Sequence, residues 1–239
     1  MIRQFDLALL GTKISNLHKL YNLDELIKDA YVVSNNSLRK LKLIGIVGKA
    51  HSGKTTTARL LQTYINTRQN ADVVNYAYTC EMSMDVKLVC SALFGLDDMF
   101  FINSELKEEI VQHLGVSPRQ LMQYTGDLFR VLFGEDFWLK RLMYDLVDNM
   151  RDRGEIHIIS GLRYQNEIDF IIRHSGIVIH LTHNQGCGTI GFPGATSEQS
   201  LDFSSSPYKK GVNYYEVNRE EYGTLQKLGV LLKQIASTL

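Results

Sequence analysis

Two kinds of hydrophobic pattern alternate along the chain. One is a short, unbroken apolar run, which is typical of a strand buried on both faces of a parallel sheet. The other is a longer stretch in which apolar residues recur every three or four positions, which is typical of a helix with one buried side. Strands are predicted at 42–47, 72–78, 156–159, 177–182 and 213–217, and helices at 55–65, 84–94, 166–174 and 220–235.

A helical block is predicted between the second and third of these strands. It runs from Ser104 to about Arg151 and is broken at 115–118 and 133–136, where Ser117 and Asp136 are of the residue types that begin helices. Strands that alternate with helices in this way predict an α/β protein of three layers, with a parallel sheet of about five strands covered on both faces.

The other segments complete the predicted domain organisation. Residues 1–41 precede the first strand and are predicted to be an N-terminal appendage of unknown role, whereas 42–239 form a single domain. Within that domain, 84–151 is a helical insertion. Four glycines within residues 186–194 predict a mobile flap at about 183–200.

A complete Gly-x-x-x-x-Gly-Lys-Thr loop joins the first predicted strand to the first predicted helix. This is the context that a P-loop requires. Its glycines let the backbone wrap a phosphate, its N–H groups and the helix N-terminus point at phosphate oxygens, and its lysine reaches the outer phosphates. The sequence therefore predicts Mg²⁺ binding by Thr55 and ATP binding by Gly48, Ser52, Gly53, Lys54, Thr55 and Thr56.

Composition narrows the class of P-loop protein. Lysine plus arginine number 26, and so do aspartate plus glutamate, so no net field draws the chain to nucleic acid or to an anionic membrane. Small, diffusible substrates are predicted instead. The three cysteines show no C-x-x-C pairing, and there is no charged-then-apolar leader, which predicts reduced thiols in a soluble cytoplasmic protein.

A helical insertion and a glycine-rich flap on a P-loop sheet favour a small-molecule kinase. In such an enzyme the insertion holds the acceptor, and the flap closes to exclude water that would hydrolyse the phosphoryl donor. A switch-type GTPase is disfavoured because the chain has no Asn-Lys-x-Asp element to read the base.

Three blocks of sequence resemble the deoxynucleoside monophosphate kinases of large DNA bacteriophages: 87–95, 115–130 and 136–140. Segment 161–169 is similar to that family's Asp-x-Arg segment, and 196–198 to the end of its His-x-Ser/Thr-Glu segment. The resemblance implies a kinase that uses ATP and Mg²⁺ to convert a deoxynucleoside monophosphate to the diphosphate. A homodimer and, for a viral protein, the host-cell cytoplasm are compatible with it.

The resemblance also assigns roles to residues. Cations are needed on both substrates because two polyanions must come together in line. The catalytic set it implies is Lys54, Arg130 and Arg163, and the acceptor-binding set is Lys87, Arg119, Asp127, Arg130 and Glu198. The alternatives are solvated surface charges for the cations, a helix-stabilising pair with Arg130 for Asp127, and an ordinary surface residue for Glu198.

Four further side chains of the insertion have two interpretations each. Trp138 and Phe137 either stack on a base or belong to the core, and aromatic residues that open an amphipathic helix are more often core. Gln123 and Tyr124 are weaker candidates for base or sugar contacts.

Three positions depart from the family pattern. Gly161 stands where an aspartate beside the metal is expected, His183 where an arginine is expected, and Ala195 where a histidine is expected. The departures leave two further hypotheses open: a nucleotide-binding regulator, sensor or decoy that transfers phosphate poorly, and a kinase for another small molecule.

Overall fold

The structure is a computed structural model that describes residues 42–49, 52–67, 76–148, 155–182, 201, 212–218, 229, 230 and 232–235. The described chain divides into two compact units. The helical unit contains residues 85–148, and the sheet unit contains the described residues of 42–84 and of 155–235. The predictions for the appendage 1–41, for the flap 183–200 and for Glu198 lie outside the described residues.

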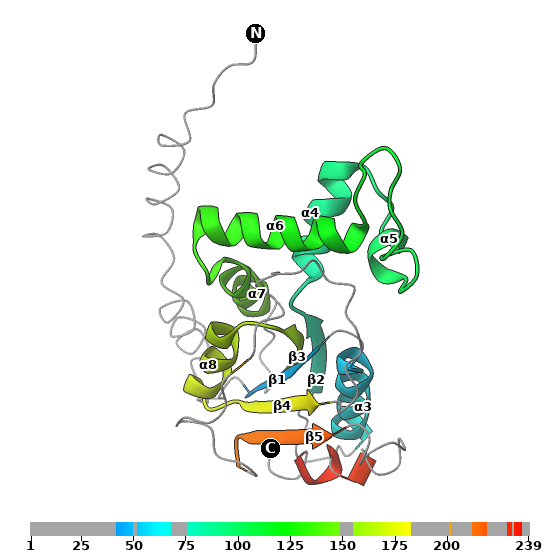
Figure 1. Cartoon of the computed structure of the whole chain (residues 1–239). Helices are drawn as coiled ribbons and strands as arrows, with labels where there is room; N and C mark the ends of the chain where they lie inside the picture. The colour runs from blue at the N-terminus through cyan, green and yellow to red at the C-terminus, as the bar shows by residue number, and fades with distance from the viewer. Residues whose placement is uncertain are drawn as a thin grey trace. The chain divides into compact units, whose positions relative to one another are not determined.

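The sheet unit is built on five parallel strands in the order β2-β3-β1-β4-β5 (Figure 1). Their bounds are β1 Lys42–Gly48, β2 Tyr76–Glu81, β3 Glu155–Leu162, β4 Ile177–Thr182 and β5 Tyr214–Asn218. The predicted α/β fold with a parallel five-stranded sheet is confirmed. Because all strands run the same way, their carboxyl ends meet at one edge of the sheet, where ligands of open α/β sheets bind.

Helices cover both faces of this sheet. Ile44 and Ile46 of β1 lie in one core cluster with Ala58 and Leu61 of helix α3 (Lys54–Thr67). Gly45 lies between the two isoleucines and therefore faces the opposite side of the sheet, toward helix α8 (Gln165–Arg173). A Cβ built on Gly45 would come 3.3 Å from Ile171 of that helix. Burial on both faces explains why the central strands read as unbroken apolar runs.

The second strand extends three residues beyond its predicted end, and the predicted start, 72–75, lies outside the described residues. The prediction was 72–78, but β2 continues to Glu81, because Thr79, Cys80 and Glu81 keep pairing with β3. The strand lies at the edge of the sheet, and Tyr78 and Thr79 are exposed there. An edge strand carries polar residues, so its end is not marked by a change in hydrophobicity.

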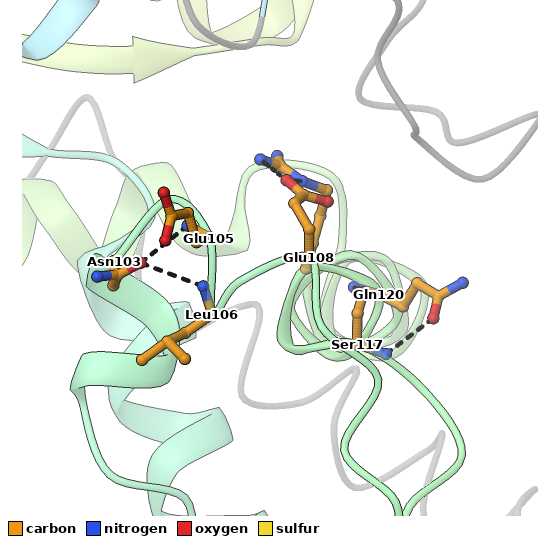
Figure 2. Close-up of polar contacts among 7 residues, drawn as sticks. Asn103, Glu105, Leu106, Glu108, Ser117 and Gln120 are labelled. Carbon is orange, nitrogen blue, oxygen red and sulfur yellow. Dashed lines mark hydrogen bonds and ion pairs between the residues drawn. The ribbon is translucent and has the colours of Figure 1, made fainter.

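The helical unit contains α4 (Met84–Phe94), α5 (Met99–Ile102), α6 (Pro118–Phe133) and α7 (Phe137–Asp148). Helix α6 begins after Ser117 with a capping box, in which Ser117 Oγ accepts from Gln120 N and Gln120 Oε1 accepts from Ser117 N (Figure 2). Asp136 directly precedes α7, and its carbonyl accepts from Lys140 N at 2.8 Å. Both predicted helix starts are confirmed.

The prediction that this helical block begins at Ser104 was wrong. Residues 104–109 form turns, and the Oδ1 atom of Asn103 accepts hydrogen bonds from Glu105 N at 2.8 Å and Leu106 N at 3.1 Å (Figure 2). A side chain that binds the following N–H groups offers them an alternative to helical hydrogen bonds. Beyond the turns, Val111 and Val116 pair in an isolated antiparallel bridge.

The aromatic residues of α6 and α7 pack on one another. Trp138 is 4% exposed, and its Nε1 donates to the Gly126 carbonyl at 3.0 Å. The Phe129 ring lies 5.2 Å from the Trp138 ring and 5.4 Å from those of Phe133 and Phe137, between ring centroids. Trp138 is therefore a core residue that joins the two helices, and the interpretation as a base-stacking residue is not supported.

None of the helices in the described part of the chain is long and apolar enough to cross a membrane.

Acid should destabilise the sheet unit through His157. This residue lies in β3, is 4% exposed, and has its pKa lowered from 6.5 to about 4 by burial. Between these values the unfolded chain binds a proton that the folded chain does not, so the free energy of unfolding should fall as the pH drops, by at most about 1.4 kcal/mol per pH unit. Urea unfolding between pH 4 and 7 measures the slope. His157→Leu should flatten it, and an equal slope in that variant would contradict the assignment.

Candidate active site

The loop after β1 has a backbone that only glycine can follow at two positions. Gly48 has a φ of +154°, and a Cβ there would stand 2.7 Å from both the Leu181 carbonyl oxygen and Ser52 Oγ. Gly53 has a φ of +86° directly before α3 begins at Lys54. Both glycines of the P-loop motif are therefore required by conformation, and Gly48 also by space.

Lys54 lies folded over this loop. Its Nζ donates to the carbonyl of Gly48 at 2.7 Å and to the carbonyl of Lys49 at 2.5 Å. The same Lys49 carbonyl accepts from Ser52 N at 3.2 Å, so the loop closes on itself beneath the ammonium group. A positive charge is thereby held at the N-terminus of α3, where the helix dipole already favours an anion.

Two features of the loop fit a phosphate. Ser52 is 6% exposed, and its Oγ has no hydrogen-bond partner among the described residues. A buried hydroxyl without a partner is costly, so a ligand oxygen that supplied one would be stabilised. Thr55 and Thr56 are exposed in the first turn of α3, where a hydroxyl can reach an anion or its counter-ion. The residues present therefore suit the phosphates of a nucleotide.

The residues that follow β3 bring a second cation to the same edge of the sheet. Arg163 comes directly after β3, and its backbone N–H donates to Glu167 Oε2 at 2.9 Å. Glu167 is 1% exposed and also accepts from Tyr164 N at 3.2 Å. The buried carboxylate thus fixes the backbone that carries Arg163. Sequence reasoning missed this role of Glu167, although an acid in the first turn of a helix is the signal for it.

The helical unit holds the other cations predicted to bind the acceptor. Lys87 lies on α4 and is 9% exposed, which is uncommon for a lysine. Arg130, in the last turn of α6, donates from Nη1 to the Glu135 carbonyl at 2.5 Å, and Asp127 precedes it by one helical turn. Arg119 forms an ion pair with Glu108, with Nη2 and Oε1 2.5 Å apart, so it is not a simple surface charge.

The predicted site residues therefore fall into two groups. The P-loop residues and Arg163 lie at the carboxyl edge of the sheet unit, whereas Lys87, Arg119, Asp127 and Arg130 lie in the helical unit. Within the described ranges, no three His, Cys, Asp or Glu side chains gather in a way that would hold a metal ion. A metal at this site would take most of its ligands from phosphate and water, as Mg²⁺ commonly does.

Comparison with known families decides the class. The deoxynucleotide monophosphate kinase family matches residues 64–190, just over half of the 239 residues. The chain belongs to this family. No individual curated protein matches the chain closely enough for comparison.

Membership confirms the resemblance noted in the sequence and places the chain among phosphotransferases of nucleotide metabolism. The match begins inside α3, beyond the P-loop, so the geometry of the loop is independent support for nucleotide binding. It includes Lys87, Arg130 and Arg163 and ends before residue 198.

Proposed function

We propose that the protein transfers the γ-phosphoryl group of ATP to a deoxynucleoside monophosphate and releases the diphosphate. The observation that carries this proposal is the P-loop of a chain in the deoxynucleotide monophosphate kinase family. The loop has two glycines required by conformation, a lysine folded over it, and a buried hydroxyl with no hydrogen-bond partner among the described residues. The substrates are small nucleotides, and the proposed location is the cytoplasm of the cell that supplies them.

On the donor side, each residue of the loop has a proposed role. The β- and γ-phosphates of ATP take the place of the carbonyl groups that now accept from Lys54 Nζ, and the ammonium follows the charge as it moves during transfer. Ser52 Oγ gains its hydrogen-bond partner from a phosphate oxygen. The Thr55 hydroxyl holds Mg²⁺ and Thr56 contacts the phosphates. A bound Mg²⁺ would neutralise negative charge on the phosphates.

On the acceptor side, the proposed ligands of the monophosphate are Lys87, Arg119, Asp127, Arg130 and Glu198. Arg130 and Arg163 are the proposed clamps on the accepting and transferring groups, because a guanidinium offers a planar fork of donors to phosphate oxygens. No general base is required. The acceptor phosphate is already ionised at neutral pH, so positioning and charge neutralisation carry the catalysis.

A coupled ADP-release assay with ATP and Mg²⁺ tests the proposal. Each of the four deoxynucleoside monophosphates is compared with a control that lacks acceptor, and ATP affinity is measured separately by calorimetry. Release that depends on a monophosphate supports the kinase and reports its base preference. Tight ATP binding with no acceptor-dependent release would instead favour a nucleotide-binding regulator.

Arg130→Ala should weaken monophosphate binding at least about tenfold and leave ATP binding close to that of the wild type, because it removes one charge-assisted contact to the acceptor alone. Calorimetric titration with each nucleotide measures both affinities. Arg173→Ala, which removes an exposed arginine from the last turn of α8, is the matched control and should change neither affinity. Equal losses for ATP and monophosphate in Arg130→Ala would show that the acceptor site lies elsewhere.

A further inference from the structure

The end of β3 carries no side chain at the position that lies beside the P-loop strand. Gly161 has a φ of +85° and forms an irregularity in the pairing with β1, in which Ile46 faces Ser160 and Val47 faces Leu162. A Cβ built on Gly161 would be in ordinary van der Waals contact, 3.8 Å from Met82 Cβ and 3.9 Å from Glu81 Cγ. The position therefore has room for a Cβ without a clash, and the side chain of Glu81 lies next to it.

Glu81 is held at this place by the end of β2. It is the last residue of β2 and pairs with Ser160, the residue before Gly161. The backbone beyond it is fixed, because Met82 N donates to the Ser160 carbonyl at 2.9 Å and Ser160 Oγ donates to the Cys80 carbonyl at 3.2 Å. The carboxylate itself accepts from Ser83 Oγ at 2.5 Å. The backbone pairing with β3 and the hydrogen bond from Ser83 together hold the Glu81 side chain in place.

Only a few carboxylates stand near the P-loop edge of the sheet unit. In the described part of that unit, Glu81 is an acidic residue at the carboxyl end of β2, and Glu167 is one in the first turn of the helix that follows β3. Glu167 is 1% exposed and accepts from two backbone N–H groups, so it serves the turn after β3. Glu81 is only partly buried, and its hydroxyl partner is a neighbour in its own turn. Glu81 is the better placed of the two to meet a ligand.

The spacing of the strands sets what Glu81 can reach. β2 lies two strands from β1, which is about 10 Å at the usual strand spacing of about 4.8 Å. An extended glutamate spans roughly 5 Å from Cα to carboxylate oxygen at ordinary bond lengths. Glu81 therefore does not reach the strand that carries the P-loop by itself, and it can contact a group bound there through a water molecule.

We propose that Glu81 positions the water ligands of the Mg²⁺ that accompanies ATP, from β2, and so supplies the carboxylate that β3 lacks at Gly161. This inference rests on the proposed function, since it assumes that ATP binds at the P-loop. Glu81 acts through water and is a positioning residue. A partner that orients a ligand of the metal typically contributes 10- to 100-fold to metal affinity.

The experiment measures how strongly Mg²⁺ tightens ATP binding, by calorimetric titration of ATP with and without the metal. Glu81→Gln should bind metal-free ATP as tightly as the wild type does. The factor by which Mg²⁺ increases its ATP affinity should be about tenfold or more smaller than in the wild type. Glu216→Gln is the matched control, because Glu216 is exposed in the middle of β5, and it should keep the full effect. Mn²⁺ electron paramagnetic resonance with bound ATP gives a second readout that needs no turnover, and its spectrum should change in Glu81→Gln alone.

A second variant tests the exchange of carboxylates between strands. Adding Gly161→Asp to Glu81→Gln puts a carboxylate back on β3, at an open position whose positive φ aspartate tolerates better than most residues. The folded double variant should regain part of the Mg²⁺ effect.

The outcomes separate this inference from the proposed function. If the wild type shows monophosphate-dependent ADP release but Glu81→Gln keeps the full Mg²⁺ effect and the wild-type Mn²⁺ spectrum, the role of Glu81 is refuted and the kinase stands. A folded double variant that regains nothing would refute the exchange between β2 and β3. If the wild type does not bind ATP, both the function and the inference fail.

Discussion

Lys54→Ala is expected to abolish acceptor-dependent ADP release, with a loss in kcat/KM of about a thousandfold or more. In the proposed mechanism Lys54 brings a full positive charge to the outer phosphates, and removing one preorganised donor to a developing charge commonly costs about 10²- to 10³-fold even when the donor is neutral. The measurement is the coupled assay at several ATP concentrations, which separates a loss in kcat from a rise in KM.

The fold should survive this substitution. The ammonium of Lys54 donates to the carbonyls of Gly48 and Lys49, which belong to the loop, and Lys49 is exposed. Circular dichroism and urea unfolding check that expectation. Lys233→Ala removes an exposed lysine from the described C-terminal helix and serves as the control, with activity unchanged. Wild-type turnover in Lys54→Ala would refute the assignment of the loop to phosphoryl transfer.

Gly176→Ala is expected to destabilise the sheet unit by about 2–4 kcal/mol, although it adds only one methyl group. The new Cβ would lie 2.7 Å from the Leu43 carbonyl oxygen and 2.8 Å from the Ile171 carbonyl oxygen. Both are backbone atoms, of β1 and of α8, so neither can move without shifting a main element, and overpacking of this kind commonly costs about 1–3 kcal/mol or more. Urea unfolding, with the midpoint and slope compared, measures the loss.

Gly126→Ala adds the same methyl group where there is room for it. Gly126 lies within α6, and no atom comes within 4 Å of a Cβ built there. Alanine in a helix interior is favoured over glycine by about 0.5–1 kcal/mol, so this control should be neutral or stabilising. If the free energies of unfolding of both variants lie within about 0.5 kcal/mol of that of the wild type, the packing of Gly176 against the backbones of β1 and α8 is looser than the distances indicate.

The fold was predictable where burial and sequence pattern agree. β4 was predicted at its observed bounds and β1 to within one residue, because strands covered on both faces are unbroken apolar runs with polar residues at their ends. Helix α4 ends at Phe94 as expected, since Gly95 has a φ of +63°. The end of edge strand β2 was misplaced because its last, partly polar residues keep pairing with β3 without a change in hydrophobicity. The turns after Asn103 were missed because the Asn103 side chain binds the N–H groups that follow it, which hydrophobic periodicity does not show.

The candidate site divides in a similar way. The P-loop could be found from the sequence, because its chemistry depends on the backbone and therefore on the spacing of glycines along the chain. Two other features could not be found from the sequence. The hydrogen bond from Arg163 N to Glu167 depends on the geometry of a turn, and the nearness of Glu81 to Gly161 depends on the pairing of β2 with β3. The roles of Arg119, Arg130 and Lys87 remain predictions, to be tested by substitution.

The position of β3 between β1 and β2 has a consequence for the newly made chain on the ribosome. Of the strands in the described part of the chain, β1 and β2 are synthesised first. They do not pair with each other, and both pair with β3, whose residue Ile156 meets Lys42 across more than a hundred intervening residues. Until residue 162 has left the ribosome, β1 and β2 therefore lack the shared neighbour that satisfies their backbone groups. Such non-local pairing is slow and leaves strand edges open to other chains. Recovery of native protein should accordingly depend on chaperones more strongly than the length of the chain alone implies.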